Sequence, residues 1–422
     1  MGTEVLLLIL ATSIVGATLG AFTGLIPGIH VNTLAAVMLA SYTSLFAAIS
    51  KFAEPDTVPV LVASCILSAS VVHSFMDFIP SVFIGAPDAD EALTMLPGHR
   101  LLMDGRGMAA VRAAAAGSAV GALSAIAISI PIQFVMLNGA AVLMEKITVY
   151  VVIFVAAVII FSAQGAKDRI FAFSLFMISG LLGVACGTGL IPSEGLLSNG
   201  TLLFPLLSGL FGIPPLLISA NNSGLPEQTD FGVDPVGPVP GLKGVITGAI
   251  AGWFPGITAT AGAALSASIQ KEKRPEEFIS LVASIGTVTS VLSLVTLSVT
   301  GSGRSGTSAV IKEIIGNELK GFCSESFVLL LLTMCVAAAI GYVMMISAGR
   351  VMSGVADRIN PKFMAIGALI VVVSLVVLMT GVGGFAVLTA AALIGIVPQQ
   401  ADLSRIPLTG CLLLPIILNS LV

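Results

Sequence analysis

Two short stretches of the chain carry the residue types that could bind an anion inside a membrane. They are GLIPGIHVNTLAAV at 24–37 and GWFPGITATAGAAL at 252–265, and each places Pro-Gly within an apolar run. Proline fixes φ, lacks an N–H and favours the first position of a helix, so we expect a half-helix to begin at each Pro-Gly. The first N–H groups of a helix have no partners within it and carry a partial positive charge, which favours anion binding.

The residues at and after the two breaks are therefore the expected substrate ligands. Glycine lets a ligand approach the backbone closely, and hydroxyl, amide and imidazole groups donate hydrogen bonds without adding a full charge. The set comprises Pro27, Gly28, Ile29, His30, Asn32, Thr33, Pro255, Gly256, Ile257, Thr258 and Thr260. Arg304 and Ser305 in GSGRSGTSA join it as an anion contact, with a solvated helix cap as the alternative. The alternative for the two breaks is a pair of proline-kinked helices that pack through glycine.

Ionisable and amide side chains in apolar segments are the expected ligands of a coupling ion. His73 and Asp77 in VVHSFMDFIP are four residues apart and so share one face of a helix. An ionisable residue at such a depth is a candidate for proton or sodium binding, and the alternative for Asp77 is an interfacial position near Pro80. Asn221 and Asn222 in ISANNSG either coordinate a cation or cap the end of a helix.

No motif for catalysis or metal binding accompanies these residues. The three histidines have no metal-ligand spacing with one another or with the five cysteines, and no Ser-His-Asp set, phosphate loop or zinc motif occurs. We therefore expect neither an enzyme activity nor a metal site nor a cofactor, with Na⁺ or H⁺ as the coupling ion. The net charge of −4 gives no indication of nucleic acid as a partner.

The two breaks belong to an internal repeat. Residues 20–36 resemble residues 248–264, and the numbering offset is constant (255 − 27 = 228 and 248 − 20 = 228). The sequence LVAS at 61–64 recurs at 281–284, with eight fewer residues intervening. Glycine- and proline-interrupted segments at corresponding positions of two halves are typical of the binding site of a transporter.

Loop charges predict that the two repeats are inverted. A basic cluster follows the second break at 271–274, whereas the matching loop at 51–56 is slightly acidic, so the positive-inside rule places these loops on opposite sides of the membrane. The expected units are a first transmembrane repeat with extra helices at 1–224, a Pro/Gly-rich linker at 225–243 and a second transmembrane repeat at 244–422.

The composition excludes a soluble protein. Hydrophobic residues make up 56% of the chain and charged residues 9%, and the mean hydropathy is +1.08. Soluble domains carry about 25% charged residues. We predict an all-α polytopic protein of the cell membrane with roughly ten to twelve transmembrane or re-entrant helices, because a β-barrel would show alternating segments of about ten residues.

The chain also resembles a known family, the large membrane subunit of the tripartite tricarboxylate transporters, and in particular its shorter prokaryotic branch of archaeal type. The likeness rests on the two break motifs, on GSGRSGTSA and on the stretch from 84 to 123. The matching positions are Gly20, Gly24, Pro27, Gly28, Pro97, Gly98, Asp104, Gly105, Gly107, Ala110, Gly117, Ser118 and Gly121. The resemblance implies a secondary carrier of carboxylates, served in some members by a small membrane subunit and an extracytoplasmic binding protein.

Three hypotheses follow for the function. The leading one is an ion-coupled secondary transporter of a small organic anion that works by alternating access around the two half-helix N-termini. The second is a translocase of a lipid phosphate, because the paired Pro-Gly motifs are also similar to those of polyprenyl-phosphate translocases. The third is a membrane scaffold, which requires the interrupted segments to be continuous helices. In every case the lipid bilayer is a partner, and both a monomer and a homodimer are compatible with the sequence.

Overall fold

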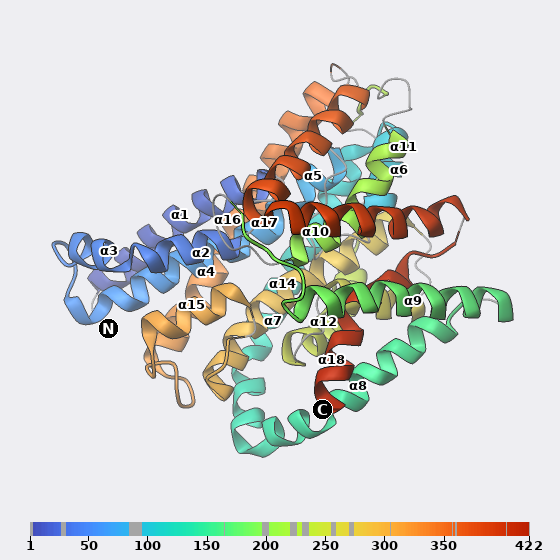
Figure 1. Ribbon diagram of the computed structural model, residues 1–422. Helices are drawn as coiled ribbons and strands as arrows, with labels where there is room; N and C mark the ends of the chain where they lie inside the picture. The colour runs from blue at the N-terminus through green and yellow to red at the C-terminus, as the bar shows by residue number, and fades with distance from the viewer. Residues whose placement is uncertain are drawn as a thin grey trace.

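Every regular element that the structure describes is a helix (Figure 1). The structure, a computed structural model, describes residues 3–26, 31–83, 95–163, 165–195, 202–219, 226–229, 236–254, 259–269, 274–303, 305–356, 358, 361–401 and 403–421. The elements are α1 (Thr3–Leu25), α2 (Val31–Ala40), α3 (Tyr42–Ile49), η1 (Pro55–Thr57), α4 (Val58–Met76), α5 (Phe78–Phe83), α6 (Met95–Met103), α7 (Gly107–Val135), η3 (Met136–Ala140), α8 (Ala141–Phe161), α9 (Ala166–Gly187), α10 (Leu203–Leu207), η4 (Ser208–Gly212), α11 (Ile213–Ser219), α12 (Pro238–Trp253), α13 (Ala259–Ile269), α14 (Pro275–Thr300), α15 (Gly306–Ile315), α16 (Glu325–Ala356), α17 (Pro361–Gln400), η5 (Ile406–Thr409) and α18 (Gly410–Leu421). The expected all-α class is confirmed for this part of the chain.

Within these ranges, seven helical segments are long and apolar enough to cross a membrane. They are Thr3–Leu25, Pro55–Phe83, Gly107–Phe161, Ala166–Gly187, Pro275–Thr300, Glu325–Ala356 and Ala365–Gln400. Gly107–Phe161 leaves helical geometry at Asn138 and Gly139, where Gly139 has a φ of 107°. Gly381, with a φ of 63°, interrupts α17 in the same way. A total of ten to twelve crossings stays a prediction.

Helices α1 and α4 pack closely through small residues. Gly16, Gly20 and Gly24 form what we call the first glycine row. The row faces α4 from Cys65 to Met76, and the residue numbers rise together along both helices, so the two helices are parallel. A Cβ atom on Gly16 would overlap the carbonyl oxygen of Cys65. Small residues at this spacing let two helix backbones approach closely in a membrane.

Helices α12 and α14 repeat this arrangement. Gly244, Gly248 and Gly252 form the second glycine row, and they face α14 from Leu281 to Leu292 with residue numbers that again rise together. A Cβ atom on Gly248 would lie only 2.7 Å from the Cβ atom of Val288. The second row follows the first at the same numbering offset that relates the two breaks (244 − 16 = 228). The same close helix packing therefore occurs once before each break.

Two further helices connect these pairs crosswise. Helix α7 lies along α14, where Gly117 contacts Ser280, and α16 lies along α4, where the hydroxyl groups of Thr333 and Ser64 are 2.9 Å apart. The two contacts are related by one shift in residue number, because Ser280 corresponds to Ser64 (280 − 64 = 216) and Thr333 corresponds to Gly117 (333 − 117 = 216). Helix α7 of the first half thus packs on α14 of the second half, and α16 of the second half packs on α4 of the first half.

The order of the contacts fixes the chain directions. Residue numbers rise together between α7 and α14 and between α4 and α16, so each of these pairs is parallel. Helices α7 and α16 are antiparallel, because Gln133 near the end of α7 accepts a hydrogen bond from Cys323 just before α16, whereas Val111 near the start of α7 contacts Gly349. It follows that the α1–α4 pair runs in the opposite direction to the α12–α14 pair.

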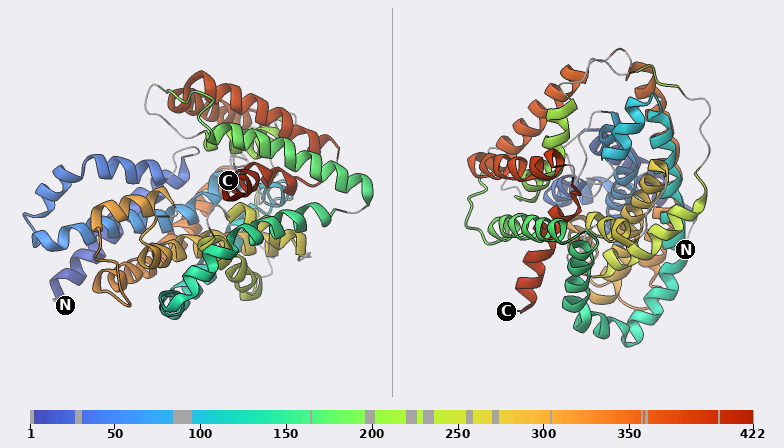
Figure 2. Two further views of the ribbon diagram at one scale, coloured as in Figure 1. Left: turned by 60° about the horizontal axis from the view of Figure 1, so that its bottom comes forward. Right: turned by 90° about the vertical axis from the view of Figure 1, so that its right-hand side faces the viewer.

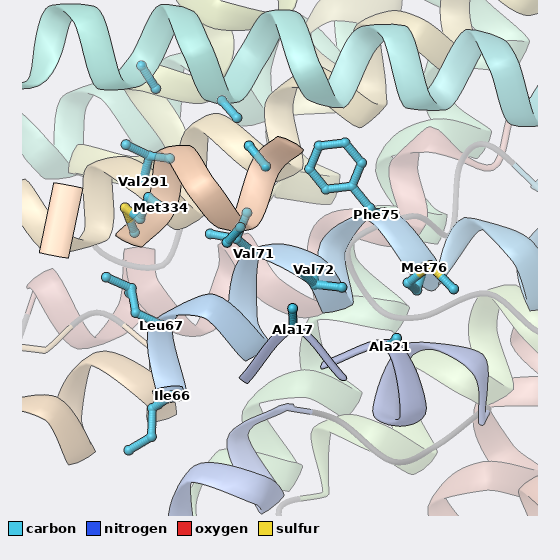
Figure 3. Packing of buried hydrophobic residues seen from close by; sticks show 14 of the residues in the cluster. Ala17, Ala21, Ile66, Leu67, Val71, Val72, Phe75, Met76, Val291 and Met334 are labelled. Carbon is cyan, nitrogen blue, oxygen red and sulfur yellow. The ribbon is translucent and has the colours of Figure 1, made fainter. Parts of the chain in front are cut away.

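Apolar side chains of α4 fill the centre of the bundle. In Figure 3, Val71 and Val72 of α4 lie between Ala17 of α1 and Met334 of α16, and Met76 lies near Ala21. Helices α8, α9, α10, α11, α17 and α18 form a second group to one side (Figure 2). This second group has its own apolar contacts and meets the central bundle through α12 and α13.

One end of the bundle gathers charged residues from both halves. A guanidinium nitrogen of Arg106 lies 2.6 Å from Oε1 of Glu276, and the Glu276 side chain is 4% exposed. This ion pair joins the turn before α7 to the start of α14. The ion pair thus places the turn at Arg106 beside the start of α14, two residues after Arg274.

The expected linker meets the same end. The amide of Gln228 accepts a hydrogen bond from the Gly107 N–H at 2.9 Å and donates one to the Leu102 carbonyl at 3.0 Å. Helix α12 begins at Pro238, so residues 238–243 of the expected linker are helical. Proline is favourable at this first helical position, because the N–H that it lacks would have no partner within the helix.

The glycine rows predict a specific stability difference. Gly20→Ala places a Cβ atom against the Ala69 carbonyl oxygen, so α1 and α4 have to separate, at a cost of about 1–3 kcal/mol. Gly354→Ala is the matched control, since no atom lies within 4 Å of a Cβ there. We expect a lower melting temperature in detergent for Gly20→Ala and an unchanged or higher one for Gly354→Ala. Equal melting temperatures would contradict the packing described.

Candidate functional site

Both segments that carry the Pro-Gly motifs are interrupted. Helix α1 ends at Leu25 and α2 begins at Val31, and in the second half α12 ends at Trp253 and α13 begins at Ala259. The scaffold hypothesis, which requires continuous helices, is not supported by these interruptions. Eleven of the seventeen predicted site residues lie outside the described residues: Pro27, Gly28, Ile29, His30, Asn221, Asn222, Pro255, Gly256, Ile257, Thr258 and Arg304. The described ones are Asn32, Thr33, His73, Asp77, Thr260 and Ser305.

The first break follows a polar contact between α1 and α4. The hydroxyl of Thr23 and Nδ1 of His73 are 3.0 Å apart and buried. Gly24, the last member of the first glycine row, faces Met76 and the backbone of His73 and Asp77. Helix α4 ends at this point, where the Asp77 N–H donates to the His73 carbonyl. The two predicted coupling-ion ligands, His73 and Asp77, therefore lie directly beside the start of the first break.

The burial of Asp77 bears on the choice between a carboxyl group within the membrane and an interfacial position near Pro80. Asp77 is at the end of α4, as the interfacial interpretation expects, but it is only 6% exposed, and α5 continues the apolar segment to Phe83. Removing a carboxylate from water is costly unless it is hydrogen-bonded or neutralised. The structure therefore describes Asp77 as a buried carboxyl group at the end of α4.

The second break lies beside α14 in the same manner. Gly252, the last member of the second glycine row, faces Thr289 and Leu292, and its carbonyl accepts a hydrogen bond from the hydroxyl of Thr296 at 3.2 Å. Thr260, in the first turn of α13 after the break, is 1% exposed. The predicted ligand Thr260 thus lies in the interior of the bundle.

The two halves meet between these breaks. The hydroxyl oxygens of Ser74 in α4 and Ser290 in α14 are 3.4 Å apart, and the numbering shift of the crosswise contacts also relates these two serines (290 − 74 = 216). Ser74 follows His73, which lies beside Gly24, and Ser290 follows Thr289, which faces Gly252. Both glycine rows therefore end within about one helical turn of the serine pair.

The serine pair is accessible although its helices are largely buried. Ser74, Thr289, Ser290 and Gly286 are all partly exposed, whereas most neighbouring residues of α4 and α14 are buried. A Cβ atom on Gly286 would have no atom within 4 Å, so open space adjoins α14 one turn before Ser290. Hydroxyl groups beside open space at a crossing of buried helices can hydrogen-bond to a polar ligand.

A second contact between the halves involves the predicted ligand Asn32. Its Oδ1 atom accepts a hydrogen bond from the Thr307 N–H at 3.0 Å, in the first turn of α15. Ser305 is the N-cap of that helix, and its hydroxyl accepts from the Ser308 N–H at 3.1 Å in a capping box. A Cβ atom on Gly306 would lie 2.8 Å from the Asn32 side chain. Asn32 from the first half therefore occupies the start of a helix in the second half.

The neighbourhood of α15 supports this adjacency. Burial, and next the negative charge of Glu318, raise the pKa of Tyr42 above its usual value, so the start of α3 lies close to the turn after α15. For Ser305, the helix-cap alternative describes the structure, because its side chain bonds within the capping box. Thr33 lies in the first turn of α2.

Sequence reasoning missed Ser74, Gly286, Thr289 and Ser290. A signal was present, since Ser74 lies between His73 and Asp77, and serine and threonine recur through α14. The LVAS match aligns α4 with α14 at a different numbering offset (281 − 61 = 220) and would pair Ser290 with Ser70, whereas the contacts pair Ser290 with Ser74. The two alignments differ by one helical turn, so the serine pair could not be identified from the sequence alone.

Among the described residues, no group of three histidine, cysteine, aspartate or glutamate side chains could hold a metal ion. The apolar spans and the interrupted helices define the class of the protein as a multi-pass α-helical membrane protein. The model of the tripartite tricarboxylate transporter TctA family matches residues 10–410, and the chain belongs to this family. It is therefore a membrane protein of a transporter family, located in the cell membrane.

The known relatives add little beyond the family. An uncharacterized protein of Methanocaldococcus jannaschii is 28% identical over 312 residues, which are 72% of each chain. No solved structure matches the chain. The family is the large subunit of tripartite transporters.

The contact between Asn32 and α15 can be tested by substitution. Asn32→Ala removes the acceptor of the Thr307 N–H and should cost about 1 kcal/mol, as for other helix caps. Asn32→Asp keeps an acceptor and adds a negative charge at a helix N-terminus, so it should retain stability. Thermal unfolding in detergent measures both. A loss of stability with Asn32→Asp as large as with Asn32→Ala would exclude the capping role.

Proposed function

We propose that the protein is a secondary transporter of a small organic anion of the carboxylate class, whose binding site lies between the two interrupted helices near the bilayer midplane. The observation that carries the proposal is the serine pair Ser74–Ser290, which lies between both breaks and adjoins open space. The family name supplies the substrate class, tricarboxylates. The new helix starts after the breaks supply N–H donors for the carboxylate groups.

Opposite chain directions support an arrangement of two inverted repeats. The α1–α4 pair and the α12–α14 pair have the same glycine packing and run in opposite directions. The shift of 216 residue numbers that relates Ser74 to Ser290 also relates the contact between α4 and α16 to the contact between α14 and α7. Inverted repeats around one central site are the usual basis of alternating access, because either half can take the conformation of the other. We therefore propose alternating access around the serine pair.

His73 and Asp77 are the proposed coupling-ion ligands. Both lie beside the first break, and Ser74 lies between them in sequence, so an ion bound there would be close to the proposed substrate site. A cation next to a carboxylate substrate lowers the cost of placing that negative charge in the membrane. Na⁺ and H⁺ both fit a carboxyl group with an imidazole. A small membrane subunit and an extracytoplasmic binding protein are the proposed partners, as the tripartite family indicates.

Filling the open space should stop transport without unfolding the protein. Gly286→Leu places a side chain where a Cβ meets no atom within 4 Å, and Gly354→Leu on α16 is the matched control with the same free surroundings. We expect Gly286→Leu to lower citrate uptake into proteoliposomes at least about tenfold, since a blocked site loses more than about 1.4 kcal/mol of binding. Gly354→Leu should retain uptake, and both variants should keep the wild-type melting temperature.

The same preparation separates the two substrate classes. Citrate and a polyprenyl phosphate are each tested for binding to the purified protein, with and without sodium. Sodium-dependent citrate binding that Gly286→Leu removes is the expected result. Binding of the polyprenyl phosphate alone would favour the lipid-phosphate translocase, and full citrate uptake by Gly286→Leu would exclude the proposed site.

A further inference from the structure

Arg405 is a buried cation that lacks a carboxylate partner among the described residues. It directly precedes η5, at the far end of the turn after α17, and it is 7% exposed. Its guanidinium donates a hydrogen bond to Oε1 of Gln399, and its Nε atom has no hydrogen-bond partner. Burial lowers the pKa of Arg405 to about 10, which is still above neutral pH, so the side chain remains charged.

A buried guanidinium in this state calls for an anion. Burying a charge is costly unless an opposite charge and hydrogen bonds compensate for it, and the neutral amide of Gln399 supplies only part of that compensation. The planar guanidinium is also the side chain best suited to bind phosphate or carboxylate through two parallel hydrogen bonds.

A cavity of about 350 Å³ adjoins the same segment. Residues 403, 404, 406 and 407, on both sides of Arg405, form one wall, and the end of α8 and the first turns of α9 form the other. The volume is within the range of about 300–1,000 Å³ that small-molecule sites occupy. Arg405 lies between these wall residues in sequence and does not itself line the cavity, so its side chain has to leave Gln399 to reach an anion bound there.

The cavity lies at the rim of the membrane-spanning segments. The spans Gly107–Phe161 and Ala365–Gln400 end there and the span Ala166–Gly187 begins there, as the right-hand side of Figure 1 shows for α8, α9 and α17. The ends of membrane-spanning helices lie at the depth of the lipid headgroups. Phe161, Ile170 and Phe173, on the same ends of α8 and α9, are 66%, 67% and 52% exposed and offer an apolar surface for acyl chains.

The charges at the cavity select a particular kind of headgroup. The carboxylate of Asp168 in the first turn of α9 lines the cavity, and the hydroxyl-bearing residues Ser162 and Ser404 also line it. A simple anion would be repelled by Asp168, and a simple cation would be repelled by Arg405. A molecule that carries both a phosphate and an ammonium group avoids both repulsions.

We propose that this cavity binds the headgroup of a phospholipid that carries a phosphate and a primary amine, with Arg405 toward the phosphate and Asp168 toward the ammonium group. The site is separate from the proposed transport site. Free phosphoethanolamine shares the headgroup chemistry, and the exposed apolar surface of α8 and α9 favours the lipid as its source.

The test measures the melting temperature of the delipidated full-length protein in detergent after addition of phosphatidylethanolamine, phosphatidylglycerol or phosphatidylcholine with identical acyl chains. Free phosphoethanolamine and inorganic phosphate are tested in parallel. We expect phosphatidylethanolamine to raise the melting temperature by about 3 °C or more and to exceed all the others. Arg405→Gln should remove this rise, and Asp168→Asn should make the ethanolamine and glycerol lipids equal. Arg358→Gln, at an exposed arginine away from the cavity, is the control that keeps the wild-type response.

A third variant keeps the proposal testable if Arg405→Gln does not fold. Ala267→Phe fills the cavity from α13 without changing either charged residue, and it should also remove the lipid response. An equal response to phosphatidylethanolamine in Ala267→Phe and the wild type would overturn the proposal. A response to free phosphate as large as the response to the lipid would also overturn it. A third contrary result is a wild type whose melting temperature no lipid changes, together with equal losses of melting temperature in Arg405→Gln and Asp168→Asn. That result would mean that Arg405 and Asp168 pair with each other.

Discussion

Close contact between helix backbones at the two glycine rows is the interaction on which the rest of the structure depends. Lipid tails are as apolar as leucine, so helices in a membrane are held together by packing and hydrogen bonds rather than by the hydrophobic effect. The first row fixes α1 on α4 and the second fixes α12 on α14. Each row ends at the glycine that precedes a break, Gly24 or Gly252, so the close packing of each helix pair extends up to its interruption.

Interrupted helices create a second requirement, because a backbone without its helical hydrogen bonds is tolerated at membrane depth only where protein or water satisfies it. Hydrogen bonds between the halves lie close to these interruptions. Asn32, just after the first break, accepts from the start of α15, and Ser74 meets Ser290 between the breaks. Near each interruption, polar groups of one half therefore have hydrogen-bond partners in the other half.

The sequence was sufficient for the fold class, the interruptions and the family, because these depend on local composition and on short motifs. Apolar runs set the helices, and α1 and α12 end at Leu25 and Trp253, directly before the two Pro-Gly motifs. Features that depend on how the helices meet were not predictable. Nothing in the sequence distinguishes Ser74 and Ser290 from the other serines of their helices. The LVAS match aligns α4 with α14 one helical turn away from the register that the contacts show. Arg405 stands out only through its burial, since an arginine near a helix end usually indicates an interface with water.

The hydrogen bonds of Gln228 have a consequence for how the halves can shift. This one side chain bonds both to the Leu102 carbonyl and to the Gly107 N–H, and the Arg106–Glu276 ion pair joins the halves at the same end. The described part of the segment between the halves is therefore held, through Gln228, at the end of the bundle where the ion pair lies. A change of angle between the halves that preserved these three bonds would displace this edge of the bundle least.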